Sequence, residues 1–181
     1  GKNIVVCSQD GPETTIIDGD MSGSCVLIIN GEDSSAVLDG FTLTNGSGWS
    51  NGSDWLGGGL VVRNGSNPVL SNLLVTGNTA NAGDEPAGGG ISIGIDSDPY
   101  LEHIVVSNNE SDWGGGISIY RSNPRLENVI ISGNHASVTG GAMYIVDSNP
   151  LLRRVQISDN SADWFGGGIY VLWDAAPIFN H

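Results

Sequence analysis

The sequence of 181 residues predicts an all-β fold, a parallel β-helix of about six coils with three short strands in each coil. Two observations predict it: a glycine-rich unit recurs with nearly constant spacing, and apolar residues alternate with polar ones inside each unit. Self-similarity at a fixed period of this length indicates a solenoid or an array. No stretch shows the uninterrupted 3.6-residue spacing of an amphipathic helix. The length suits a single domain over residues 1–181.

Three residue types recur at nearly constant spacing and mark the turns of the repeat. A glycine triplet begins at Gly57, Gly88, Gly114 and Gly166, with the variant Gly140–Ala142 between the last two. Prolines follow at intervals of 31, 25, 26 and 27 residues, at Pro68, Pro99, Pro124, Pro150 and Pro177. An asparagine column contains Asn78, Asn109, Asn134 and Asn160. Glycine suits sharp corners and close backbone contacts, and proline suits the start of a strand. Asparagine amides one coil apart can bond each other, so we expect a ladder through the stack.

Each unit contains three short stretches of period-two hydrophobicity, which is a strand signal. In one unit, Ile117 and Ile119 flank Ser118, Leu126 follows a proline, and Val129 and Ile131 flank another residue. About 25 residues with three strands make one coil, with neighbouring coils ~4.8 Å apart. We expect irregular N-terminal coils over residues 1–45, regular repeats over 46–181, and a longer parent protein.

The units resemble the right-handed parallel β-helix of the pectin-lyase-like superfamily. More narrowly, "ISGNHASVTGGAM" (131–143) is similar to the surface repeat of polymorphic outer-membrane proteins, F-x-x-N followed by G-G-A-[ILV]. The resemblance covers about residues 24–181. It implies a right-handed coil and a secreted or cell-surface bacterial protein. It does not specify the activity, because this fold serves lyases, hydrolases, adhesins and inert stalks.

The charge balance narrows the classes of partner. Six Lys and Arg residues stand against twenty Asp and Glu, a formal net charge of −14. This argues against nucleic acid as a partner and against docking on anionic lipid, because both need a basic surface. No apolar run reaches the roughly 18 residues of a membrane span, so we expect no membrane insertion. Cys7 and Cys25 are too few for a disulfide framework, although one bridge between them is an open alternative.

Residues for catalysis are sparse. The resemblance implies either Ca²⁺ held by carboxylates beside an Arg or Lys base, or an Asp cluster near a His and an Arg-x-Lys segment. The only lysine is Lys2, and the three histidines lie in different columns. If the chain is an enzyme, the charged centre is Asp96, Arg121 and Asp147, with the two carboxylates ~10 Å apart across two coils. The same column also fits a surface ion ladder, which we prefer.

Two turns before glycine triplets are lengthened, "GSGWSNGSDWL" (46–56) and "TANAGDEPA" (79–87). These turns and the next coil supply acidic residues on one corner: Asp54, Asp84, Glu85 and Asp112. Several oxygens converging on one side suit Ca²⁺, and solvated turns are the alternative. No cofactor is otherwise required.

Aromatic residues give the most specific binding hypothesis. Trp55, Trp113 and Trp164 follow Asp at the same corner of three coils. Tyr144 and Tyr170 are expected on the outward face of the adjoining strand, with Tyr120 in the neighbouring column. Rings beside Asp, Asn and Ser can stack on a sugar chain and hydrogen-bond to it. The alternative is that the tryptophans fold over the corner and seal it.

The opposite side carries an outward row expected to be apolar, comprising Val5, Thr42, Leu74, Val105, Ile130 and Gln156. An exposed apolar strip suggests that another chain or domain lies on it, which would allow side-by-side self-association. End-to-end self-association is expected from the unpaired strand edges at the end of the solenoid. The preferred interpretation is a non-catalytic extracellular module that acts as a scaffold or as an adhesive surface for a polysaccharide or cell-surface glycan. The alternatives are a polysaccharide lyase or glycoside hydrolase, and a stalk or filament subunit.

Overall fold

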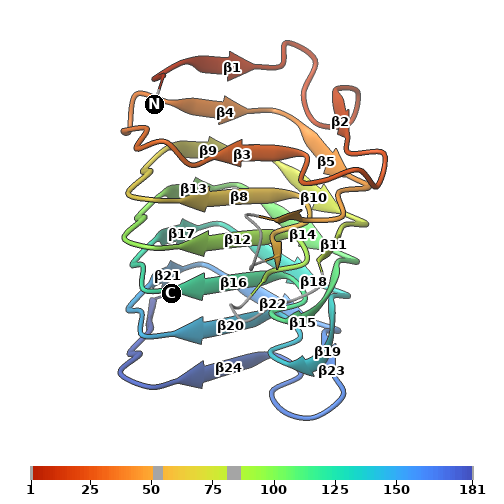
Figure 1. Ribbon diagram of the computed structural model, residues 1–181, viewed down its shortest axis with the longest axis vertical. Coiled ribbons are helices and arrows are strands. Elements are labelled where there is room, and N and C mark those ends of the chain that lie inside the picture. The colour runs from red at the N-terminus through yellow and green to blue at the C-terminus, as the bar shows by residue number, and fades with distance from the viewer. Residues whose placement is uncertain (1, 51–54, 81–86, 181) are drawn as a thin grey trace.

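The computed structural model describes residues 2–50, 55–80 and 87–180, which form six stacked coils and the first strand of a seventh (Figure 1). The coils run from β1 (Val5–Cys7) at the top of Figure 1 to β24 (Ile169–Leu172) at the bottom. Each strand of the stack pairs in parallel with the strand one coil away. The prediction of an all-β fold, a parallel β-helix, is therefore confirmed.

Three long sheets run through the stack. Sheet A contains β1, β4 (Val37–Asp39), β9 (Val69–Ser71), β13 (Tyr100–Glu102), β17 (Arg125–Glu127), β21 (Leu151–Arg153) and β25 (Ile178–Asn180). Sheet B contains β2 (Ile16–Asp18), β5 (Thr42–Thr44), β10 (Leu74–Thr76), β14 (Val105–Ser107), β18 (Ile130–Ser132) and β22 (Gln156–Ser158). Sheet C contains β3 (Val26–Ile28), β8 (Leu60–Arg63), β12 (Ile91–Gly94), β16 (Ile117–Tyr120), β20 (Met143–Val146) and β24.

A fourth, shorter sheet lies between sheets B and C, and we call it the corner sheet. It contains β11 (Thr79–Ala80), β15 (Glu110–Trp113), β19 (His135–Thr139) and β23 (Ser161–Ala162). Its buried positions hold the small side chains Ala80, Ser111, Ala136 and Thr139, so no apolar alternation in the sequence predicts this sheet. A separate antiparallel pair joins β6 (Trp49–Ser50) to β7 (Trp55–Leu56).

The core is a set of aligned apolar columns inside the coil. Leu70, Leu101, Leu126 and Leu152 stack in register on sheet A and are at most 1 % exposed. Because each such side chain contributes roughly 1.5–3 kcal/mol on burial, the columns hold the coils together along the axis.

The bend between sheets A and B is made by one residue per coil in a left-handed conformation. Asn72, His103, Asn128 and Arg154 take φ values of 50°, 53°, 54° and 49°. Asparagine tolerates this region better than most residues, which explains its presence in two of the four coils. Chemically different side chains therefore project from the same bend.

The expected asparagine ladder is present beside the glycine corner. Each side-chain amide donates to the next carbonyl oxygen, with distances of 2.9 Å from Asn78 to Asn109, 3.0 Å from Asn109 to Asn134 and 2.9 Å from Asn134 to Asn160. The same oxygens also accept the backbone N–H of the preceding coil's asparagine. Asn78, Asn109 and Asn134 are at most 1 % exposed, so the ladder satisfies polar groups that water does not reach.

A second ladder, of buried serines, runs through the turn between sheets C and A. The backbone N–H groups of Ser66, Ser97 and Ser122 donate to the hydroxyl of the serine one coil further, at 3.1–3.2 Å. Its N-terminal end is closed by Glu32, whose Oε2 accepts the Ser66 hydroxyl at 2.9 Å.

The glycine corner explains why the triplet recurs. Gly114 takes φ of +73°, and a Cβ built on Gly115 would lie 2.3 Å from the carbonyl oxygen of His135. Glycine is therefore required at position 114 by the backbone conformation, and at position 115 by the close approach of the neighbouring coil. The prolines lie immediately before the strands of sheet A, as expected, and the carbonyl of Pro99 accepts the N–H of Arg125 one coil away.

Cys7 and Cys25 are free, so the alternative of a bridge between them is not realised. Cys7 is exposed on β1, whereas Cys25 lies at the glycine corner, where its Sγ contacts the Thr44 carbonyl oxygen at 3.2 Å. The two residues belong to different sides of the coil, and the structure keeps them apart.

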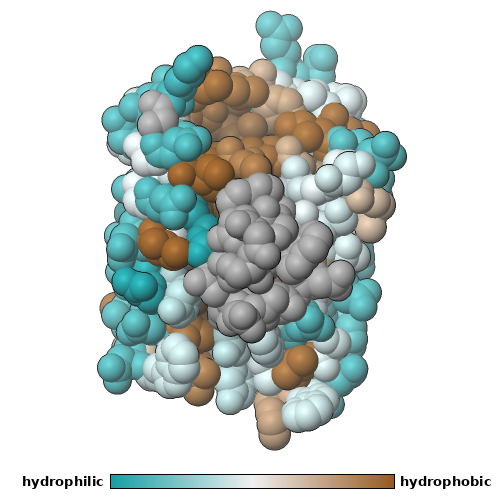
Figure 2. All heavy atoms as spheres, in the orientation of Figure 1, coloured by the Kyte–Doolittle hydropathy of each residue, from teal (hydrophilic) through white to brown (hydrophobic). Residues whose placement is uncertain are grey.

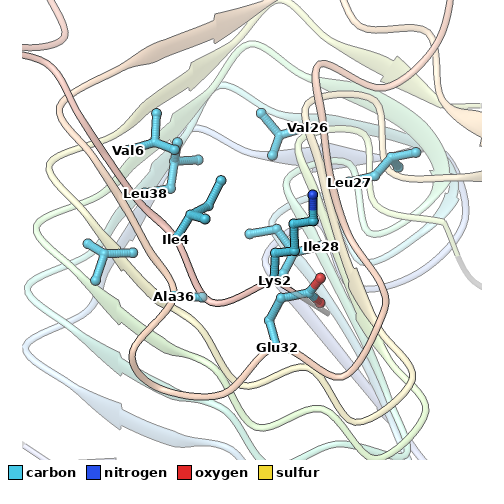
Figure 3. A pocket seen from close by; sticks show the side chains of 10 residues that line it. Lys2, Ile4, Val6, Val26, Leu27, Ile28, Glu32, Ala36 and Leu38 are labelled. Carbon is cyan, nitrogen blue, oxygen red and sulfur yellow. The ribbon is translucent and has the colours of Figure 1, made fainter.

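The N-terminal end of the stack opens into an apolar basin of about 170 Å³ (Figure 3). Its lining comes from inward positions of the first two coils, including Val6, Val26, Ile28 and Leu38, with Lys2 and Glu32 at the rim. Figure 2 shows hydrophobic side chains gathered at this end of the molecule. The basin is the continuation of the core.

Candidate functional site

The outward face of sheet C carries the aromatic column that the sequence predicts. Parallel register aligns Tyr144 with Tyr170, and Ser118 lies one coil before them. The rings of Tyr144 and Tyr170 are stacked, with centroids 5.7 Å apart and planes at 1°. Trp113 extends the stack from the corner, with its ring centroid 6.4 Å from that of Tyr144 and planes at 25°. Three rings from consecutive coils thus follow the helix axis, and we call them the aromatic ladder.

Burial differs along the aromatic ladder. Tyr144 is 9 % exposed, and burial, followed by the nearby Tyr170, raises the pKa of its phenol. Trp113 and Tyr170 are half-buried. Tyr144 therefore supports the stack, and its two neighbours present ring surface to solvent.

Exposed rings continue the ladder at its C-terminal end. Phe165 contacts Tyr170 with centroids 6.5 Å apart and is 61 % exposed. Trp164 and Trp173 are each 71 % exposed, before and after β24 respectively. Flat apolar surface is therefore concentrated along one edge of sheet C and across its last coil.

The predicted alignment of Trp164 with Trp113 is off by one residue. Thr139 pairs with Trp113 in one coil and bridges to Phe165 in the next, so Phe165 takes the position that corresponds to Trp113. The N–H groups of Trp164 and Phe165 both donate to the Val138 carbonyl, which shows the local irregularity. As a result Phe165, rather than Trp164, makes the ring contact with Tyr170.

The remaining predicted aromatic residues lie off the ladder. Tyr120 is half-buried in the neighbouring outward row, aligned with Gly94 and Val146. Trp55 begins β7, and its side chain lies outside the described residues.

A polar strip on the corner sheet borders the aromatic ladder. A hollow of about 250 Å³ is lined by Thr79, Ala80, Glu110, Ser111, Asp112 and Ser137. The Ser137 hydroxyl donates to Asp112 Oδ1. One row over, His135 Nδ1 lies 3.0 Å from the Ser161 hydroxyl, and its Nε2 lies 3.8 Å from Asp163. Hydroxyl, carboxylate and imidazole groups therefore line the corner sheet, on which Trp113 also lies.

The predicted metal ligands can be placed only in part. Asp54, Asp84 and Glu85 lie outside the described residues. Asp112 lies on the corner sheet, bonded to Ser137. Within residues 2–50, 55–80 and 87–180, no group of three or more His, Cys, Asp or Glu side chains is arranged to hold a metal ion.

The charged column predicted for catalysis is exposed on the turn between sheets C and A. Arg121 aligns with Asp147, because the Arg121 N–H donates to Val146. On the other side Arg121 aligns with Ile95, because one extra residue in that coil displaces Asp96 by one position. All three charged residues take positive φ, at 58° for Asp96, 49° for Arg121 and 48° for Asp147. Among the described residues no ion pair joins them.

The apolar row on sheet B also differs from the prediction. Ile16, rather than Val5, aligns with Thr42 at the N-terminal end, because Val5 belongs to sheet A and pairs with Val37. Thr42 is 7 % exposed, and its hydroxyl donates to the Pro12 carbonyl at 2.6 Å. The loop between β1 and β2 thus covers part of the row, and a groove of about 490 Å³ lies beside this loop.

Sequence reasoning missed a charged cluster on the outward face of sheet A. Glu127 Oε2 accepts from Arg125 at 2.5 Å, and its Oε1 accepts from Arg154, with Arg153 at 4.0 Å. Hydrogen bonding from Arg125, helped by Arg154 against an opposing effect of burial, lowers the pKa of Glu127 to about 2. Part of this cluster could be predicted, because Arg125 and Glu127 are two apart on one strand and Arg153 follows Glu127 by one coil. The approach of Arg154 to the same carboxylate does not follow from the register.

Comparisons with known proteins agree with the architecture. Among the described residues, no helix has the length and apolar character needed to cross a membrane. No curated protein and no solved structure matches the chain. The family described as "Right handed beta helix region" matches residues 6–181. That match is to the β-helix as a class and does not distinguish the pectin-lyase-like superfamily from the polymorphic outer-membrane proteins. Since the match covers nearly the whole chain, the protein belongs to the right-handed β-helix family.

Proposed function

We propose that this β-helix is an extracellular binding module that holds a neutral polysaccharide along the outward face of sheet C, without cleaving it. The observation that carries the proposal is the aromatic ladder of Trp113, Tyr144 and Tyr170, three rings stacked along the coil axis. Pyranose rings present C–H surfaces that pack on aromatic rings, and the ring surface that Trp113 and Tyr170 leave exposed offers such a contact.

The border of the ladder supports a sugar as the ligand. Asp112 and Ser137 on the corner sheet offer acceptors and donors for sugar hydroxyls beside Trp113. The flanking carboxylates and the net charge of −14 favour a neutral chain over a polyanionic one, because like charges repel. The rigid repeat supports this use, since buried ladders fix each coil relative to the next.

The proposal is tested with a glycan array, followed by a reducing-end and uronate-release assay on the glycans that are retained, with and without Ca²⁺. Retention without bond cleavage is the expected result. Cleavage that depends on Ca²⁺ would contradict the non-catalytic part and turn attention to Arg121 and the acidic turns. An array with no retained glycan would contradict the binding function itself.

A further inference from the structure

The arginine cluster on sheet A is the second place where the structure gathers recognition chemistry. The chain has six Lys and Arg residues in total, and three of them, Arg125, Arg153 and Arg154, converge on Glu127 in two consecutive coils. This face is distinct from sheet C, so the inference below does not depend on glycan binding there.

Two of the three guanidinium groups are held in place. Arg125 lies over the ring of Tyr100, 5.2 Å from its centroid, while its Nη2 donates to Glu127. Arg154 donates from Nε to Asn128 Oδ1 at 2.6 Å and from Nη2 to Glu127. Ordered guanidinium forks lose little entropy when they bind a ligand, which favours recognition.

The third arginine, Arg153, is not hydrogen-bonded to Glu127. The nearest nitrogen of Arg153 is 4.0 Å from Glu127, beyond hydrogen-bond range, and its side chain is 38 % exposed. Arg125 and Arg154 are also accessible, at 47 % and 46 %. Donors on all three groups therefore face solvent around one point of the sheet.

The local charge is positive although the chain as a whole is acidic. Glu127 and Glu102, aligned on neighbouring strands, offset two of the three positive charges. One positive charge remains, and salt screens more distant carboxylates over about 8–10 Å. A carboxylate offers two oxygens, which Glu127 already uses to bind Arg125 and Arg154. A ligand that contacts all three guanidinium groups at once needs oxygens that point in more directions than the two of a carboxylate.

We propose that Arg125, Arg153 and Arg154 form a binding site for a tetrahedral oxyanion, a sulfate or phosphate group. Arg153 supplies the uncommitted donors, and Arg125 and Arg154 supply donors that Tyr100, Asn128 and Glu127 hold in position.

The test is a nuclear magnetic resonance titration of the arginine side-chain Nε–Hε signals with sodium sulfate, with sodium chloride adjusted to keep ionic strength constant. The signals of the three arginines are expected to shift together and saturate in the millimolar range, about 1 mM for a site of this size. Shifts that are spread over the protein and do not saturate would overturn the proposal.

Arg153→Gln separates binding from structure. It leaves both hydrogen-bonded pairs of Glu127 intact, so the melting temperature is expected to stay unchanged while sulfate affinity falls about tenfold. Lys2→Ala removes one positive charge at the far end of the stack and is expected to leave sulfate affinity unchanged. Equal affinity in wild type and Arg153→Gln would overturn the site, and equal midpoints for acetate and sulfate would overturn its preference for a tetrahedral group.

Discussion

The ring planes of Tyr144 and Tyr170 are parallel to within 1°, and the ring centroids lie 5.7 Å apart, on strands one coil apart. Because the coil repeat fixes this spacing, a ring placed at the same position in consecutive units is stacked by the fold itself. A solenoid can in this way build an extended recognition surface from one residue per repeat.

The buried asparagine ladder should be a main source of stability. Asn134→Ala removes the oxygen that accepts hydrogen bonds from the backbone N–H and from the side-chain amide of Asn109. It also removes the side-chain amide that donates to the Val106 carbonyl. Because these groups are buried, we expect the free energy of unfolding to fall by about 3 kcal/mol. Urea denaturation measures it. Asn149→Ala is the control, because its exposed side-chain oxygen accepts the Ala176 N–H, and its loss should cost less than about 1 kcal/mol. Equal losses would contradict the role assigned to burial.

The glycine corner gives a matched pair of substitutions. In Gly115→Ala the new Cβ would meet the His135 carbonyl oxygen at 2.3 Å, so the backbone must shift. We expect a loss of about 3 kcal/mol in the free energy of unfolding. Gly168→Ala places its Cβ 4.0 Å from the nearest atom and should be tolerated. Thermal or urea unfolding checks both, and a stable Gly115→Ala protein would show that the close approach is misassigned.

Acid should weaken the sheet A cluster. The pKa of Glu127 is lowered from 4.5 to about 2 in the folded protein, so its contribution to stability is complete above about pH 4.5 and is lost as the pH falls towards about 2. Glu127→Gln lacks this contribution at every pH. The difference in free energy of unfolding between wild type and variant should therefore shrink across that window. A difference that stays constant from pH 7 to pH 2 would contradict the ion network.

The repeating columns made most of the fold predictable. Asn109 and Asn134 occupy equivalent places in their units, so their contact followed from the period alone. Alignment failed where coils differ in length or regularity. The long loop after β1 shifted Ile16 into the place predicted for Val5, and an irregular corner gave Phe165 the place predicted for Trp164.

The candidate sites were predictable to different degrees. The stacking of Trp113, Tyr144 and Tyr170 was predictable, because the register between consecutive coils places their rings next to one another. The arginine cluster escaped prediction because long side chains reach diagonally between strands: Arg125 aligns with Leu151, yet its guanidinium group meets the same carboxylate as that of Arg154. Register alone does not reveal such convergence.

The most direct test of the binding proposal is isothermal titration of the best-retained glycan into wild type and into the double variant Trp113→Ala/Tyr170→Ala, with Phe179→Ala as the control. Phe179 is an exposed aromatic residue on sheet A, 52 % exposed and away from the ladder. The double variant is expected to lose at least about tenfold in affinity while remaining folded, and the control is expected to bind like wild type. Unchanged affinity in a folded double variant would contradict the aromatic ladder as the polysaccharide-binding surface.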